Sequence, residues 1–170
     1  MLSKKMEAAF NDQIAAEFFS AHLYLAMAAY LEDIDLPGFA NWMRIQYQEE
    51  VFHGMKMFDF VIERDGRALV KSWEEPQAEW KDPVDVFAEV YKHEQKVTSL
   101  IHNLVDIALE EKDHASYSFL QWFVDEQVEE ESTAKGILQQ LKLMGESKGA
   151  LFQLDRELGA RVYTPPATGE

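Results

Sequence analysis

Cysteine is absent from this sequence of 170 residues, so disulfides, thiolate metal sites, cysteine nucleophiles and iron–sulfur clusters are excluded. Glycine and proline are scarce, at 8 and 5 residues, and neither occurs between positions 3 and 32. Because both residues disfavour helix interiors, their absence there favours one long uninterrupted helix.

Basic residues are also few: 16 Lys and Arg stand against 31 Asp and Glu, which gives a net charge of −15. This balance argues against binding to nucleic acid or to anionic membrane surfaces. No apolar signal core follows the lysines near the N-terminus, and no apolar run approaches the length of a membrane span. We therefore expect a cytoplasmic protein that forms one domain over residues 1–170.

Five segments carry apolar residues at the three- and four-residue spacing of an amphipathic helix. They cover residues 3–32, 37–65, 82–112, 113–145 and about 148–158. Pro37 suits a helix start, and Asp82 and Asp113 suit N-caps. Gly66 and Gly145 are expected to end the helices that precede them.

The connection from Arg67 to Lys81 shows no helical period and contains Pro76. Fully extended, it spans on the order of 50 Å, which exceeds the roughly 40 Å length of each long helix. The first and third connections are short and make antiparallel hairpins. The predicted fold is all-α: a four-helix bundle over residues 3–145 with one long crossover between helices two and three, a short C-terminal fifth helix and a frayed tail at 161–170.

Each apolar stripe is interrupted near its middle by side chains that can bind metal. They are Glu17, Glu50, His53, Glu94, Gln127 and Glu130. The interval from Glu17 to Glu50 is 33 residues, as is that from Glu94 to Gln127, so the sequence reads as one hairpin used twice. Packed about a pseudo-two-fold axis, the two hairpins direct these groups to one point.

A single glutamate on an apolar stripe is usually a boundary residue whose carboxylate reaches solvent. Several at matching depth are harder to explain in this way, because each isolated carboxylate in a dry core costs several kcal/mol or becomes protonated. Two divalent cations would remove that cost. Oxygen ligands with one imidazole favour iron or manganese over a tetrahedral zinc site.

The pattern Glu17, Tyr24, Glu50-x-x-His53, Glu94 and Gln127-x-x-Glu130 resembles the ferroxidase centre of non-haem bacterial ferritins, and the similarity covers nearly the whole chain. The resemblance implies a ferritin-like fold in which Glu17, Glu50 and His53 hold one iron. Glu50 would bridge to a second iron held by Glu94 and Glu130, with Gln127 close by and Tyr24 beside the centre. A possible third iron site matches Glu49, Glu126, Glu129 and Glu130.

The same resemblance implies iron storage and detoxification. Fe(II) would be oxidised by dioxygen or peroxide at the intra-subunit di-iron centre and kept as Fe(III) mineral. The shell would be a hollow homo-oligomer of 24 subunits, with the fifth helix packed around a symmetry axis.

Departures from related families narrow this expectation. Bacterioferritins and rubrerythrin-like peroxidases look similar but have a second Glu-x-x-His where this chain has Gln127-x-x-Glu130. Bacterioferritins also have a haem-binding methionine at the position of Val51, so no haem is expected. The mini-ferritins that protect DNA place their ligands between subunits, which does not fit four ligand-bearing helices in one chain.

Two alternatives remain open on the same bundle. A di-metal oxygenase or peroxidase would need a substrate cavity beside the metals, and a helical scaffold would use metal only for stability. His22, His93, His102 and His114 lie off the ligand stripes and are expected to be surface or boundary residues. Trp122 lies one turn from Glu126 and is either a core residue or a redox neighbour.

Overall fold

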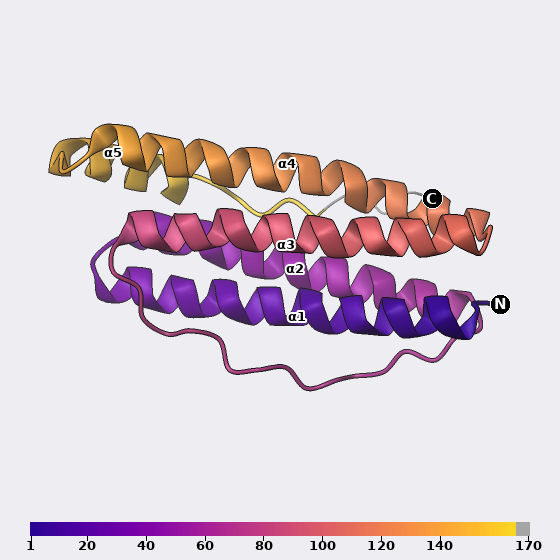
Figure 1. Ribbon diagram of the computed structural model, residues 1–170. Coiled ribbons are helices and arrows are strands. Elements are labelled where there is room, and N and C mark those ends of the chain that lie inside the picture. The colour runs from indigo at the N-terminus through magenta and orange to yellow at the C-terminus, as the bar shows by residue number, and fades with distance from the viewer. Residues whose placement is uncertain (166–170) are drawn as a thin grey trace.

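Five α-helices make up the fold in the computed structural model, which describes residues 1–165 (Figure 1). They are α1 (Lys4–Asp33), α2 (Pro37–Glu63), α3 (Pro83–Glu110), α4 (His114–Met144) and α5 (Lys148–Gly159). The predicted all-α fold is confirmed, and every long helix lies within about two residues of its expected bounds. The expectation for residues 166–170 of the tail lies outside the described residues.

The helices begin where short polar side chains can satisfy free backbone N–H groups. Asp82 accepts a hydrogen bond from the Asp85 N–H at 2.9 Å, and Asp113 accepts one from the Ser116 N–H at 3.1 Å. Pro37 and Pro83 occupy the first helical turns of α2 and α3, where a missing N–H costs nothing. The predicted starts are therefore confirmed.

The end of α2 differs from the prediction in its detail. The left-handed residue is Asp65, with φ of 57°, rather than Gly66. The Gly66 N–H bonds the Val61 carbonyl at 2.8 Å, which closes the helix with a Schellman-type turn. A Cβ on Gly66 would lie 2.9 Å from that carbonyl oxygen, so glycine is needed for the close approach and not for its φ. Gly145, with φ of 55°, ends α4 as predicted.

The connection after α2 runs back along the length of the bundle beside α1, so that α2 and α3 are parallel (Figure 1). Asn11 on α1 binds the start of this connection. The Asn11 side chain accepts a hydrogen bond from the Leu69 N–H at 2.6 Å and donates one to the Arg67 carbonyl at 2.9 Å. The predicted crossover between two antiparallel hairpins is confirmed.

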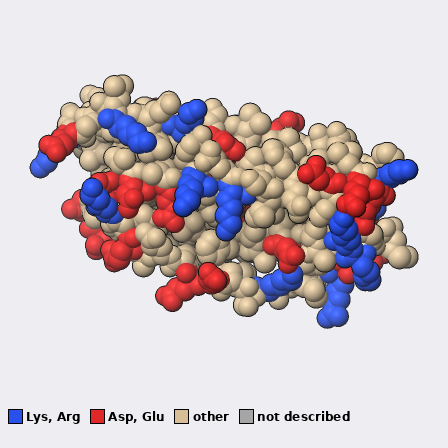
Figure 2. Space-filling model, viewed as in Figure 1, with Lys and Arg blue, Asp and Glu red and all other residues tan. Residues whose placement is uncertain are grey.

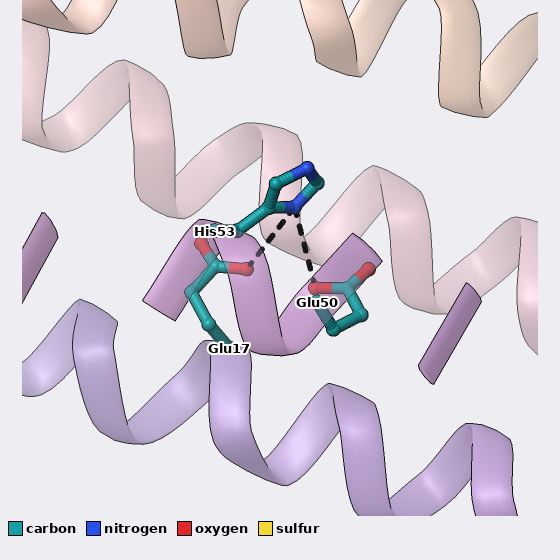
Figure 3. A group of neighbouring side chains, drawn as sticks. All are labelled: Glu17, Glu50 and His53. Carbon is teal, nitrogen blue, oxygen red and sulfur yellow. Dashed lines mark ion pairs between the residues drawn. The ribbon is translucent and has the colours of Figure 1, made fainter. Parts of the chain in front are cut away.

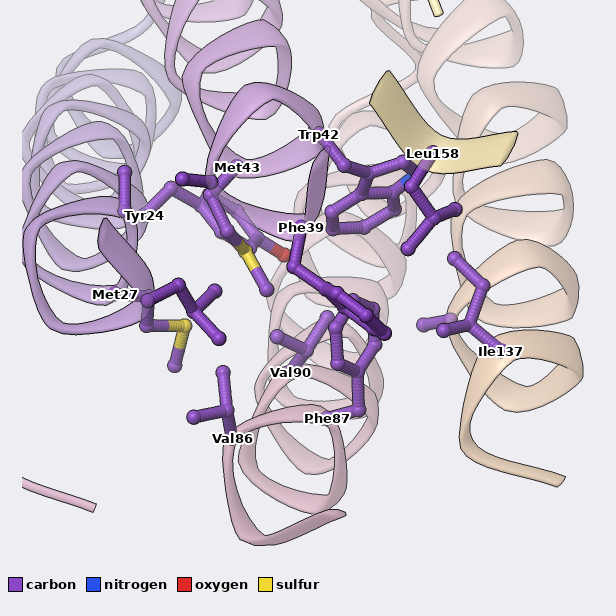
Figure 4. Close-up of a cluster of buried hydrophobic side chains, with 14 of the residues drawn as sticks. Tyr24, Met27, Phe39, Trp42, Met43, Val86, Phe87, Val90, Ile137 and Leu158 are labelled. Carbon is purple, nitrogen blue, oxygen red and sulfur yellow. The ribbon is translucent and has the colours of Figure 1, made fainter. Parts of the chain in front are cut away.

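The apolar interior is divided into two clusters with a polar layer between them. One cluster lies at the end of the bundle where α5 packs and includes Phe39, Trp42 and Phe87 (Figure 4). The other lies at the opposite end and includes Phe10 and Leu120. Because both ends bury extensive apolar area, the bundle is held closed around the polar side chains at its middle.

One expectation about apolar runs needs correction. Helix α1 is long and apolar enough, by length and composition alone, to cross a membrane. Half of its most apolar stretch is buried inside the bundle. On the face shown in Figure 2, acidic and basic side chains lie beside one another in groups, with uncharged surface between the groups.

Candidate metal centre

The six predicted ligands lie in the polar layer at the middle of the bundle, and each is at most 6% exposed. They are Glu17 on α1, Glu50 and His53 on α2, Glu94 on α3, and Gln127 and Glu130 on α4. The helical spacing that suggested one focal point is thus matched by burial of every one of these side chains. Buried charged groups of this density need partners or a bound cation.

Glu17, Glu50 and His53 face one another across the contact between α1 and α2 (Figure 3). Each offers one ligand atom, and these three atoms lie within 4.8 Å of one another. The His53 Nδ1 atom is 3.6 Å from Glu50 Oε2 and 3.9 Å from Glu17 Oε2. Both distances are too long for hydrogen bonds, and within residues 1–165 neither carboxylate oxygen has a hydrogen-bond partner.

Burial sets the protonation of this group. Desolvation lowers the pKa of His53 to about 4, helped by the nearby Lys56 ammonium, so the imidazole is neutral near pH 7. Desolvation raises the pKa of Glu50 well above its usual value, and the Glu17 carboxylate raises it further. Desolvation also raises the pKa of Glu17. A cation that binds beside the neutral imidazole therefore competes with protons for both carboxyl groups.

The opposite side of the layer is formed by α3 and α4 and is already joined by hydrogen bonds. Tyr24 donates its hydroxyl hydrogen to Glu94 Oε1, and Gln127 Nε2 donates to Glu94 Oε2 at 3.2 Å. Desolvation raises the pKa of Glu94 to about 7, against the lowering effect of these two hydrogen bonds. Desolvation and the Glu94 charge raise the pKa of Glu130 well above its usual value.

The ligands predicted for a third site are less enclosed. Glu49 is partly buried and pairs with Arg161, with Nη2 to Oε2 at 2.8 Å. Glu126 is half-buried, and Glu129 is exposed. Within residues 1–165, Glu17, Glu50 and His53 are the one trio of acidic or histidine side chains whose ligand atoms meet within 4.8 Å. The third site stays a prediction.

Three further residues contact the predicted ligands. Gln13 Nε2 donates to Glu17 Oε1 at 2.8 Å, and Gln46 Nε2 donates to Glu130 Oε2 at 2.9 Å. Arg161 donates to Gln46 in turn. The buried position of Gln46 on the stripe of α2 was a usable signal, and Gln13 lies one turn before Glu17, but nothing in the sequence around Arg161 indicated its contact.

The remaining aromatic and histidine residues take ordinary positions. His93 is half-buried, as expected, and its Nε2 atom lies 2.8 Å from Ser20 Oγ. The Trp122 ring meets the His53 ring edge-on at 5.4 Å between centroids, so Trp122 borders the centre. A cavity of about 360 Å³ near the crossover is lined by Ser20, Trp73 and His93, and by none of the predicted ligands.

Comparison with known proteins gives a consistent result. The ferritin-like domain family matches residues 7–144. The bacterial non-heme ferritin of Bacteroides fragilis is 45% identical over 161 residues, which cover 95% of this chain and 100% of that protein. The bacterial non-heme ferritin of Staphylococcus haemolyticus is 44% identical over 163 residues, or 96% and 98% of the two chains.

Solved structures agree in fold along the same length. A crystal structure described as a novel open pore ferritin from Archaeoglobus fulgidus superposes with a TM-score of 0.94 at 55% identity, covering 95% of this chain and 99% of that one. A humanized archaeal ferritin superposes with a TM-score of 0.96 at 54% identity, covering 97% and 100%.

Proposed function

This chain belongs to the ferritin family, and from that premise we propose that it stores iron and oxidises Fe(II) at the buried centre. The observation that carries the proposal is the pair of orphaned carboxylate oxygens on Glu17 and Glu50, which face a neutral imidazole nitrogen. A purely structural core has no use for this arrangement, because each unpaired buried oxygen costs free energy. A cation among the three ligands removes that cost.

We assign one iron to Glu17, Glu50 and His53 and a second to Glu94 and Glu130, with Glu50 between them. Gln127 gives its Nε2 hydrogens to Glu94, which leaves its carbonyl oxygen as the atom available to a cation. Hard oxygen ligands suit both oxidation states of iron as substrate and product. Glu49, Glu126 and Glu129 are proposed to receive a third ion at the more exposed edge of the centre.

The chain contributes charge neutralisation, spacing and exclusion of water to the oxidation. Two Fe(II) ions each give up one electron, and dioxygen or peroxide accepts the pair. Because burial raises the pKa of Glu50 and Glu130 well above the usual value, binding of the ions competes with protons at both carboxyl groups. The Tyr24 hydroxyl stays protonated, because desolvation and the nearby carboxylates raise its pKa, and it holds Glu94 in place by its hydrogen bond.

Storage requires a compartment, and we propose a cytoplasmic homo-oligomeric shell of 24 subunits without haem. The support lies in the family and in the exposed apolar side chains near α5. Leu143 is 90% exposed and Phe152 is 63% exposed. In a single chain these apolar side chains remain in contact with water. Contact between subunits would bury them.

The test is aerobic Fe(II) loading, with ferric absorbance and particle size followed together. We expect fast oxidation and hundreds of irons retained per large soluble particle. Glu17→Ala should slow the fast phase, whereas Glu63→Ala, which changes an exposed glutamate on α2, should not.

Three outcomes would contradict parts of the proposal. Uptake that stops at two or three irons per chain would exclude storage and favour an oxygenase or peroxidase. Turnover of an organic substrate without iron retention would do the same. Fe(II) oxidation no faster than in buffer alone would mean that the bound metal has only a structural role.

A further inference from the structure

The chain beyond α5 turns back along the bundle instead of leaving it (Figure 1). Asn41 on α2 fixes this turn, because its Nδ2 atom donates to the Leu158 carbonyl at 3.3 Å and to the Arg161 carbonyl at 3.1 Å. Arg161, which follows α5 and Ala160 in the chain, is thereby held against α2. The expected frayed tail is thus wrong for Arg161.

The Arg161 side chain is held by three groups on successive turns of α2. Its Nη2 atom donates to both oxygens of Glu49, at 3.0 and 2.8 Å. Its guanidinium carbon lies 5.1 Å from the centre of the Trp42 ring, in a cation–π contact. Its Nη1 atom donates to Gln46 Oε1. With three partners, the guanidinium has a single defined position.

The contact with Gln46 has a directional consequence. A guanidinium can only donate hydrogen bonds, so the Gln46 carbonyl oxygen must face Arg161. The NH₂ group of the same amide must then face Glu130, and it donates to Oε2 at 2.9 Å. Gln46 is fully buried, so water cannot take over either bond. If the amide were reversed, its carbonyl oxygen would face Glu130 and repel it once that carboxylate is ionised as a metal ligand.

We propose that Arg161 is a positioning residue for the metal centre, which acts through Gln46 to orient the Glu130 carboxylate. The inference rests on the proposed function, since it takes Glu130 as a ligand. It goes beyond that function by coupling the segment after α5 to the iron on the α3–α4 side. Groups that orient metal ligands typically change affinity by about 10- to 100-fold when removed.

The test is anaerobic titration of the metal-free assembled protein with Co(II), followed by visible absorption. Arg161→Gln should weaken the ion on the Glu94–Glu130 side by about 10-fold or more and leave the ion at Glu17, Glu50 and His53 within about twofold. Arg161→Lys keeps a donor-only cation but loses the planar fork that reaches Glu49 and Gln46 together, so it should restore the affinity only in part. Arg156→Gln removes an exposed arginine from α5 with the same charge change and should have no effect.

A second comparison separates orientation from general damage. In a Gln46→Leu background the relay is absent, so Arg161→Gln should cause no further loss of affinity. Equal weakening of both ions, or full additivity with Gln46→Leu, would overturn the proposal. So would unchanged Co(II) binding in Arg161→Gln. If the unmodified protein itself bound no Co(II) at the buried ligands, the proposed function would fail instead. Size-exclusion chromatography of each variant establishes that the assembly is intact.

Discussion

The Asp155 carboxylate on α5 caps the N-terminus of α2 by accepting a hydrogen bond from the Gly38 N–H at 2.8 Å. It also accepts one from the Phe39 N–H at 3.0 Å, whereas Leu36, at the local cap position, offers no side-chain bond. A Cβ on Gly38 would lie 1.6 Å from the Asp155 carbonyl oxygen, so only glycine permits the approach. The fifth helix is therefore bound to the helix that carries Glu50 and His53.

Asp155→Ala is expected to lower the free energy of unfolding by about 1–2 kcal/mol, because α2 loses the side-chain cap that Asp155 provides and a charge at the positive end of its dipole. Hydrogen–deuterium exchange should also rise in α5. The matched control is Asp82→Ala, which removes the local cap of α3 and should cost a similar amount without changing exchange in α5. Equal exchange in α5 for both variants would contradict the conclusion that Asp155 binds α5 to the N-terminus of α2.

Glu50→Gln is expected to stabilise the metal-free protein at pH 8 and to weaken metal binding. The neutral amide avoids the cost of burying the Glu50 charge, or of taking up a proton there on folding, which burial and Glu17 impose by raising the Glu50 pKa. A gain of about 1 kcal/mol corresponds to a midpoint roughly 2–4 °C higher. Thermal unfolding with and without Co(II) should show the higher midpoint and a smaller metal-induced rise. Glu63→Gln, on the exposed face of α2, should change neither value.

Much of the fold was predictable, because helix faces and local caps are encoded within a few residues. The stripe through Glu50 and His53 and the cap at Asp113 each required only local spacing, and both match the structure. The residue that takes the left-handed conformation after α2 was not predicted, because either Asp65 or Gly66 can adopt it and the sequence does not rank them.

Contacts between segments far apart in the sequence escaped prediction. Asp155 lies 117 residues from Gly38, and Arg161 lies 112 residues from Glu49. No sequence periodicity or motif links the two residues of either pair, because each contact depends on where α5 packs against the bundle. Helical spacing identified the ligands on their faces, but the groups that orient those ligands follow from three-dimensional packing alone.

Gln13→Leu is expected to weaken metal binding at Glu17 by about 10-fold, because it removes the donor that orients the carboxylate. Co(II) titration measures the loss. Gln48→Leu is the matched control, since the Gln48 side chain is exposed and its amide donates to the Arg44 carbonyl on its own helix. An equal loss in both variants would mean that Gln13 has no specific role.

Glu94 should make the stability of the metal-free protein depend on pH in a defined direction. Burial raises its pKa from 4.5 to about 7, so the folded state binds the proton more tightly than the unfolded state does. The stability that this group contributes is complete below pH 4.5 and is lost as the pH rises to 7. Compared with Glu94→Gln, the unmodified protein should lose about 3 kcal/mol of its free energy of unfolding between pH 4.5 and 7, and little more above pH 7.

The comparison with Glu94→Gln isolates this effect from the buried histidines. His53 and His93, whose pKa values burial lowers to about 4, act in the opposite direction between pH 4 and 6.5, but they are present in both proteins. Denaturant unfolding at equal protein concentration gives the difference at each pH. Tyr24→Phe removes a hydrogen bond that lowers the Glu94 pKa, so the loss should extend to higher pH in that variant. A difference independent of pH would show that Glu94 is not desolvated as described.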